Sequence, residues 1–385
     1  MESIINIIQS TYLIERVTSL MIYVIVLYFE YAYICRATTY TQIKRYLNIY
    51  LIILVLMAFF FVPDASKDLA RILRNTDYWK NLSLSDVYRY EIAKSTTPIG
   101  QVYIYFCRKT QIDGFLPAIT AFLFFNNVFY ILKKCYKDLN CTSKSIAISL
   151  LVFMSSGCFL EVISDIKCFL GFSIVCRCVF EDLCLKKNIV KNVPFYVVAS
   201  LIHLSVVPIV VLRLLFYIIF ESGIKPIEKV FSTMILLIVS GGTVLYFDDL
   251  IDAVLNKANS YLSGGHYSYL WEYIIGSVFW LLLVYTLKIY KENKEKHDND
   301  LIMESLNKFS LLFIAVEAIF CFEYNIFHRY LLISLFMSIP FISILISKYD
   351  IPKKSQSNII IISVLVLLLV CMRGNLCGYK FFVLN

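Results

Sequence analysis

Repeated apolar runs of bilayer length are the feature that most restricts how this chain can fold. About 20 apolar helical residues cross the hydrocarbon core of a membrane, and runs of that kind recur between residues 17 and 372. Hydrophobic residues make up 59% of the chain and charged residues 17%, whereas a typical soluble domain is about 25% charged. One soluble core cannot bury so many runs, so the sequence predicts an all-α polytopic integral membrane protein.

About twelve transmembrane helices are predicted, and ten to thirteen are compatible with the sequence. The run 193–220 is interrupted by His203 and Pro208, and it could form one tilted helix or two short ones. Two helices are favoured, because the basic loops then alternate along the whole chain. The expected spans lie near 17–35, 46–62, 114–132, 145–160, 165–184, 193–206, 207–220, 229–247, 270–290, 304–322, 328–346 and 358–372.

Basic residues in alternate short loops set the predicted orientation. Loops such as 184–192 and 347–357 are rich in Lys, and the positive-inside rule places them in the cytoplasm. Both termini and the long polar segment 64–113 are then extracytoplasmic. We expect 1–385 to form a single transmembrane domain, with short interfacial or re-entrant helices in the outer loop 64–113.

Composition also excludes several classes of function. The net charge of +8 lies mostly in short loops, where it is a topology signal, so no nucleic-acid partner is predicted. The twelve Cys are scattered singly, with no CxxC pair and no His at metal-ligand spacing. The sequence therefore predicts buried free thiols and no metal site.

The outer loop contains residues suited to an anionic ligand. In a helix Asp68 and Arg71 lie on one face, although a solvated interfacial helix with ion pairs is the simpler interpretation. Segment 97–111 is too short to span and is predicted to be re-entrant or interfacial. Cations and aromatic rings interleave along the loop, which would suit a lipid-linked sugar phosphate, and an interfacial aromatic belt is the alternative.

Ionisable groups near the ends of the spans gather at the predicted outer face. An ionisable group near the bilayer centre costs about 2.5–3.5 kcal/mol unless it faces protein or water. Lys167 near the start of one span could bind a ligand or snorkel, and His203 near the end of the next could act as a base or pack in the core. Four further residues are placed at the same face: Arg213, His266, His328 and Arg329.

Five fragments together resemble the EpsG-like branch of the Wzy-type polysaccharide polymerases. They are KDLARI (67–72), TPIG (97–100), SDIKCFLGFSI (164–174), ASLIHLS (199–205) and FHRYL (327–331). The resemblance implies a glycosyltransferase of the bacterial inner membrane that joins undecaprenyl-diphosphate-linked oligosaccharides at the outer face, in O-antigen, capsule or exopolysaccharide synthesis. It also implies a lipid-linked oligosaccharide substrate among the membrane lipids, a chain-length regulator protein as a partner, and no cofactor or nucleotide sugar.

By the same similarity, the functional residues of the family fall on Asp68, Lys167, His203 and Arg329. The position of Lys167 is usually Arg in the family, and Lys would bind phosphate as a point charge without the bidentate fork of Arg. His203 or Asp68 would act as the base. The predicted ligands of the diphosphate and glycan are Lys167, Arg329, Arg71, Arg213, His266 and His328.

Two other classes of function remain open on the sequence. A flippase or ion-coupled transporter would line a path through both leaflets with charge, whereas the candidate residues lie at one face. An O-antigen ligase would use the same kind of lipid donor, and only the order of the fragments favours a polymerase over it.

Overall fold

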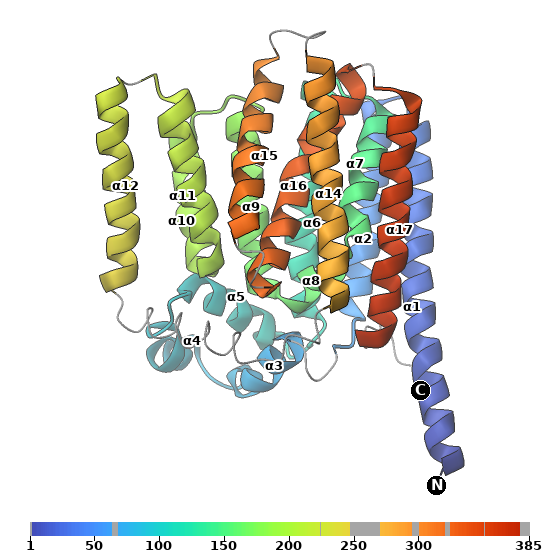
Figure 1. Cartoon of the computed structure of the whole chain (residues 1–385). Helices are drawn as coiled ribbons and strands as arrows, with labels where there is room; N and C mark the ends of the chain where they lie inside the picture. Colours follow the sequence, from blue (N-terminus) through green and yellow to red (C-terminus); the bar gives the residue numbers. More distant parts are fainter. Residues whose placement is uncertain are drawn as a thin grey trace.

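The computed structural model of the chain describes residues 2–63, 68–223, 225–246, 270–294, 300–319, 324–349 and 351–377. Within these ranges the chain is helical and contains no β-strand, which confirms the predicted fold class. The long helices stand side by side as a bundle (Figure 1). They are α1 (Glu2–Arg36), α2 (Tyr40–Phe59), α6 (Phe115–Asp138), α7 (Ser143–Ser155), α9 (Ile166–Leu183), α10 (Val193–Ile202), α11 (Val207–Phe216), α12 (Pro226–Tyr246), α14 (Leu270–Asn293), α15 (Leu301–Ile319), α16 (Tyr324–Lys348) and α17 (Lys353–Cys377).

Not all of these helices are long and apolar enough to cross a membrane alone. Seven helices in the described part of the chain meet that requirement, or eight if the bent pair of α7 and α8 (Cys158–Ser164) counts as one span. Helix α9 does not, because Lys167, Arg177 and two acidic residues interrupt its apolar sequence. The structure thus confirms a polytopic bundle, and seven or eight of the predicted twelve spans meet this requirement in the described residues.

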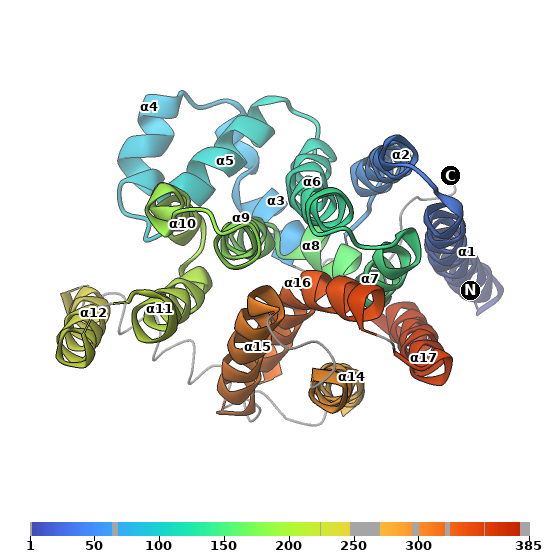
Figure 2. The same ribbon diagram turned by 90° about the horizontal axis from the view of Figure 1, so that it is seen from above.

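Helix α16 lies at the centre of the bundle (Figure 2). Of the residues in its spanning segment, 89% are buried, compared with 28% in the spanning segment of the peripheral α17. Rings of Phe124, Phe153 and Phe336 meet at centroid distances of 5.4–6.3 Å and fix α6, α7 and α16 against one another. Because α16 begins with the FHRYL fragment, the middle of the bundle positions the residues at its start.

One end of the bundle, here called the capped end, is covered by short helices from the long polar loop. They are α3 (Asp68–Asn75), α4 (Leu84–Val87) and α5 (Pro98–Lys109), together with the single turns Asp77–Lys80 and Tyr88–Ile92. Figure 1 shows α3, α4 and α5 across this end. The 12 residues of α5 do not span a bilayer, as predicted for segment 97–111.

The opposite end, here called the basic end, gathers the loops that the sequence predicts to be cytoplasmic. The backbone N–H of Thr142 donates to Ser347 Oγ at 2.8 Å, and Lys144 Nζ donates to Gln356 Oε1 at 2.8 Å, so the α6–α7 and α16–α17 connections meet there. The N-cap hydroxyl of Thr142 also accepts from the Ser145 backbone, which begins α7 at this end. These contacts agree with the predicted alternation of the loops.

The run 193–220 forms two helices, because the helical hydrogen bonds stop at His203. This residue has extended backbone angles of φ −156° and ψ 129°, and Pro208 occupies the first turn of α11, where a missing N–H is tolerated. Figure 2 shows α10 and α11 as separate columns. The two-helix alternative is therefore the correct one.

Segment 145–160, predicted as a span, is bent in the structure. Gly157 has a left-handed φ of +73°, and α8 (Cys158–Ser164) leaves α7 at 54°. A Cβ added at Gly157 would lie 2.6 Å from Val370 Cγ1 of α17, so glycine also permits this close approach. The bend carries α8 toward the capped end, beside the start of α9.

Candidate functional site

The beginnings of α9 and α16 meet at the capped end through an ion pair. Arg329 Nη2 lies 2.7 Å from Asp165 Oδ2, and the two side chains are 23% and 18% exposed. Asp165 directly precedes α9, and Arg329 lies near the start of α16. The pair is therefore neither sealed in the core nor fully solvated.

His203 reaches the same region from the break between α10 and α11. Its Nδ1 accepts the Ser205 backbone N–H at 3.3 Å and lies 2.6 Å from Ser205 Oγ. Tyr330 OH in turn donates to the Ser205 carbonyl at 3.1 Å, which ties this turn to α16. A backbone N–H can only donate, so Nδ1 is the acceptor nitrogen and Nε2 carries the proton of the neutral ring.

Cys168 completes a group that could hold a small cation. Ligand atoms of Asp165, Cys168 and His203 all lie within 4.8 Å of one another, a donor set that suits Zn²⁺. The Arg329 guanidinium already pairs with Asp165, and the adjacent Lys167 adds a second positive charge at the start of α9. These two positive charges oppose a divalent cation, and they are the groups of this site that could hold an anionic ligand.

Lys167 lies where α5 meets the end of α10. A Cβ at Gly100 would lie 2.5 Å from the Ile202 carbonyl oxygen and 3.0 Å from Lys167 Cδ. Separations this short are below van der Waals contact, so only glycine lets α5 approach α10 at this point. The TPIG fragment therefore holds the cap directly over Lys167 and the turn at His203.

His328 and Glu161 extend the site toward α8. His328 Nε2 lies 3.7 Å from Glu161 Oε1, and both side chains are partly exposed. His328 precedes Arg329, so the bend at Gly157 brings an acid of α8 next to the Arg329–Asp165 pair. We call Asp165, Lys167, Cys168, His203, Ser205, His328, Arg329 and Tyr330 the capped-end cluster.

Asp68 and Arg71 lie on α3, and their predicted shared face is confirmed by an ion pair of 2.9 Å. Helix α3 packs against α8, so both residues belong to the cap near the cluster. Their side chains are 38% and 63% exposed and pair with each other. No contact in the described structure joins either of them to Asp165 or His203.

Arg213 does not join the cluster, contrary to its predicted place near the outer face. It is buried near the basic end, with Nη2 2.8 Å from Glu221 Oε2 and Nε 3.5 Å from Asp182 Oδ2. Counting residues along a span could not show that α11 turns this side chain toward the end of α9. The remaining predicted ligand, His266, lies outside the described residues.

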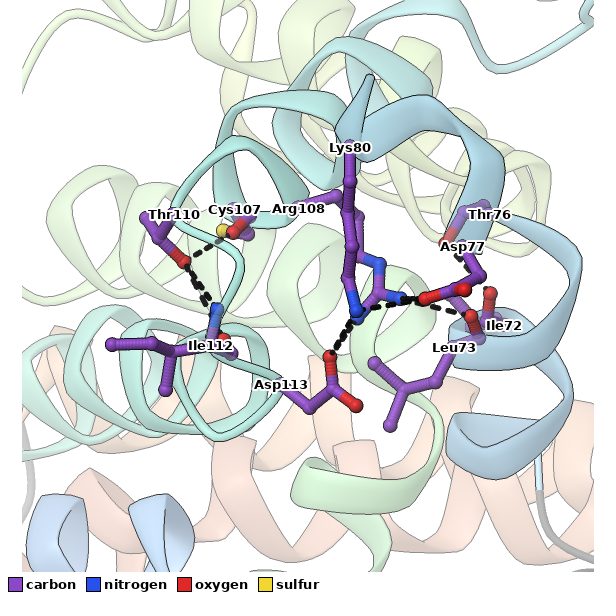
Figure 3. A network of polar contacts seen from close by, with 10 residues as sticks. All are labelled: Ile72, Leu73, Thr76, Asp77, Lys80, Cys107, Arg108, Thr110, Ile112 and Asp113. Atoms are coloured by element: carbon purple, nitrogen blue, oxygen red, sulfur yellow. Dashed lines mark hydrogen bonds and ion pairs between the residues drawn. The ribbon is translucent and has the colours of Figure 1, made fainter. Parts of the chain in front are cut away.

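A separate network fixes the cap itself (Figure 3). The buried Arg108 guanidinium donates to Asp113 Oδ1 at 2.5 Å, to Asp77 Oδ1 at 3.0 Å and to the Leu73 carbonyl at 3.0 Å. Lys80 Nζ lies 2.7 Å from Asp77 Oδ1; its hydrogen bond and charge lower the pKa of Asp77, and that hydrogen bond raises the pKa of Lys80. Arg108 therefore stabilises the cap. From the sequence it is one of the loop cations predicted to suit an anionic sugar.

Several residues of the cluster are not predicted from the sequence. Asp165 and Cys168 lie within the SDIKCFLGFSI fragment, and Ser205 lies within ASLIHLS. The sequence pattern singles out only Lys167 and His203, because an ionisable group inside an apolar run is costly. An acidic residue directly before a transmembrane span is typical of an ordinary helix N-terminus. The break in the apolar run at His203 is the sequence signal that could have indicated Ser205, because the break brings Ser205 next to the His203 side chain.

The helical bundle and its cation-bearing cluster define a polytopic membrane protein with a candidate anion site at one end. The sequence model of the EpsG family matches residues 77–382 of the 385, so the chain belongs to the EpsG family. Membership supports a polysaccharide polymerase-type function with glycosyltransferase-like activity. No curated protein and no solved structure matches the chain.

The family match covers four of the five fragments quoted from the sequence. It begins at Asp77, so the fragment KDLARI, with Asp68 and Arg71, lies outside it. The capped-end cluster lies entirely inside.

Proposed function

We propose that this protein polymerises oligosaccharide repeat units carried on a polyprenyl diphosphate, at the outer face of a bacterial cytoplasmic membrane. The observation that carries the proposal is the capped-end cluster, where Arg329, Lys167 and His203 arrive from three distant parts of the chain. Two cations suit a diphosphate and an imidazole suits proton transfer. The cluster requires neither a nucleotide sugar nor a bound cofactor.

The proposed reaction transfers the growing glycan from its lipid diphosphate to a new repeat unit. A hydroxyl oxygen of the acceptor forms a bond to the anomeric carbon of the donor, and the bond from that carbon to the diphosphate oxygen breaks. The electron pair leaves with the diphosphate, whose growing negative charge Arg329 and Lys167 stabilise. Arg329 contributes a planar fork and Lys167 a point charge.

The acceptor hydroxyl must also lose a proton. Nδ1 of His203 is the basic nitrogen of the neutral ring, and Ser205 Oγ stands 2.6 Å from it. In our proposal Ser205 passes its hydroxyl proton to Nδ1 as it receives the proton of the acceptor sugar. His203 thus ends the step as an imidazolium beside Asp165, and Asp68 on α3 is the alternative base.

The experiment that tests the proposed function uses purified full-length protein in vesicles with lipid-linked repeat units isolated from a deletion strain. Products with many repeat units are expected, and products that stop at one unit would contradict the proposal. In cells, deletion should remove the long-chain glycan ladder and leave a single capped repeat unit. Loss of both species would instead indicate a flippase or a ligase.

The orientation is a further part of the proposal. Basic loops gather at the end opposite the cap, and by the positive-inside rule this supports an outward position for the capped-end cluster. A membrane-impermeant maleimide should therefore label Lys94→Cys in the cap of intact spheroplasts and spare Lys186→Cys at the basic end, both exposed positions. The reverse labelling pattern would overturn the outward placement. Wild-type protein serves as the background control, because the native thiols of the described chain are buried or partly buried.

A further inference from the structure

An apolar pocket of about 210 Å³ opens between α11 and α15, next to the capped-end cluster. Apart from the hydroxyl of Tyr330, every side chain that lines it is a hydrocarbon. The lining includes Ile209, Leu212 and Leu215 of α11, Phe313 and Val316 of α15, and Tyr330 of α16. In a bilayer such a pocket is a place for a hydrocarbon chain.

The two helices that flank the pocket are in contact on its basic-end side. There the rings of Phe216 and Phe309 contact edge to face, with centroids 5.3 Å apart. From this contact the pocket extends along α11 as far as Pro208, which lies five residues from His203. It is thus a groove that is closed near the basic end and continues to the cluster at the capped end.

Tyr330 joins the apolar groove to the polar cluster. Its ring lines the pocket and packs against Phe313 at a centroid distance of 6.1 Å, while its hydroxyl donates to the Ser205 carbonyl. The preceding residue, Arg329, pairs with Asp165. An amphiphile with a hydrocarbon tail in the groove would therefore place its head group at the cluster.

We propose that the groove between α11 and α15 holds the polyprenyl chain of the lipid-linked substrate and fixes its diphosphate at Arg329 and Lys167. This inference rests on the proposed function, and it adds the place where the lipid chain of the substrate binds. The occupant is argued from charge: a diphosphate carries only negative charge, and Arg329 and Lys167 are the cations of the capped-end cluster. A zwitterionic phospholipid would bring its own cation next to Arg329 and Lys167, which is unfavourable.

The test measures binding of two probes to the purified full-length protein in phosphatidylcholine nanodiscs. Undecaprenyl diphosphate has both head and tail, and inorganic diphosphate has only the head. Leu212→Trp and Val316→Trp fill the groove from different helices, and Leu311→Trp adds the same ring to α15 at an exposed position outside the lining. Each variant is first checked for a monodisperse elution profile.

The groove variants should bind undecaprenyl diphosphate about tenfold more weakly than wild type, since part of the tail stays outside its apolar site. Their affinity for inorganic diphosphate should be unchanged, and Leu311→Trp should resemble wild type with both probes. The proposal is overturned if Leu311→Trp weakens the lipid probe as much as the groove variants do. It is also overturned if phosphatidylglycerol displaces undecaprenyl diphosphate at equal concentration, because the groove would then be a general lipid site.

The two proposals fail in different ways. If wild-type protein binds the lipid as described and forms no polymer, the proposed function fails and the groove remains a lipid site. If wild-type protein forms polymer while the groove variants bind and polymerise normally, only the inference about the groove fails.

Discussion

Two groups of charged residues occupy opposite ends of this bundle and differ in how far they are sealed. At the basic end Arg213 and Asp182 are each 1% exposed at the side chain. At the capped end Arg329 and Asp165 are 23% and 18% exposed. Both are Arg–carboxylate pairs between helices, so residue type and sequence position do not distinguish them.

The partners of the two pairs explain the difference. Asp182 also accepts from Tyr196 OH at 2.6 Å and Asn192 Nδ2 at 2.6 Å, and Arg213 reaches a second acid, Glu221. Protein groups thus surround the pair at the basic end, where it locks α9, α10 and α11 together. The pair at the capped end lies beside an imidazole, a hydroxyl and an apolar groove, and this is where we propose that the substrate binds. The two pairs thus differ in how completely protein groups enclose them.

Replacement of Arg213 tests the structural half of this comparison and should have the largest effect on stability. Arg213→Ala leaves the carboxylate of Asp182 buried without the guanidinium beside it. A change of this kind typically lowers the free energy of unfolding by ~3–5 kcal/mol. We expect a lower melting temperature and less monodisperse protein after heating in detergent. Arg329→Ala is the matched control, because its partner stays partly solvated. Equal melting temperatures for Arg213→Ala and wild type would show that the Arg213–Asp182 pair does not hold α9, α10 and α11 together.

Replacement of Ser205 tests the other side of this comparison, the proposed function of the cluster at the capped end. Ser205→Ala keeps the backbone N–H to His203 but removes the hydroxyl that lies 2.6 Å from Nδ1. We expect roughly tenfold or greater loss of the polymerisation rate, within the range of general acid–base effects, and a changed pH dependence of that rate. Ser205→Thr should restore much of the activity. A Ser205→Ala enzyme with the wild-type rate and pH profile would refute the proton relay.

The smallest predicted effect concerns the cap. Lys80 holds the pKa of Asp77 below its ordinary value of 3.8, with Arg108 adding to the effect. The folded pKa is depressed, so this stabilisation is present above the ordinary value and is lost as the pH falls through the folded value. The protection factors of residues 68–113, which correct the hydrogen-exchange rates for the intrinsic dependence of exchange on pH, should therefore fall slightly on acidification from about pH 5 to about pH 3. Asp77→Asn should lack this component, and an identical pH response in both proteins would contradict it.

The sequence alone was sufficient for the helical class and for part of the cluster. Apolar period and loop charge do not depend on packing, so they predicted the helices, the two-helix run at His203 and the common end of Lys167, His203 and Arg329. They could not show which way Arg213 points, because a side chain's direction depends on the rotation of its helix. Nor could they show the role of Asp165, whose partner Arg329 lies far along the chain and meets it only through the bend at Gly157 and the packing of α16.

The central claim is that the capped-end cluster performs the polymerisation, and Arg329 tests it most directly. The measurement is the length of the glycan formed from lipid-linked repeat units by Arg329→Ala, at wild-type protein levels in vesicles, with Arg329→Lys alongside. We predict a loss of about 100-fold or more in rate for Arg329→Ala, as for other groups that stabilise charge in a transition state, and partial activity for Arg329→Lys. Full-length polymer from Arg329→Ala at the wild-type rate would contradict the account.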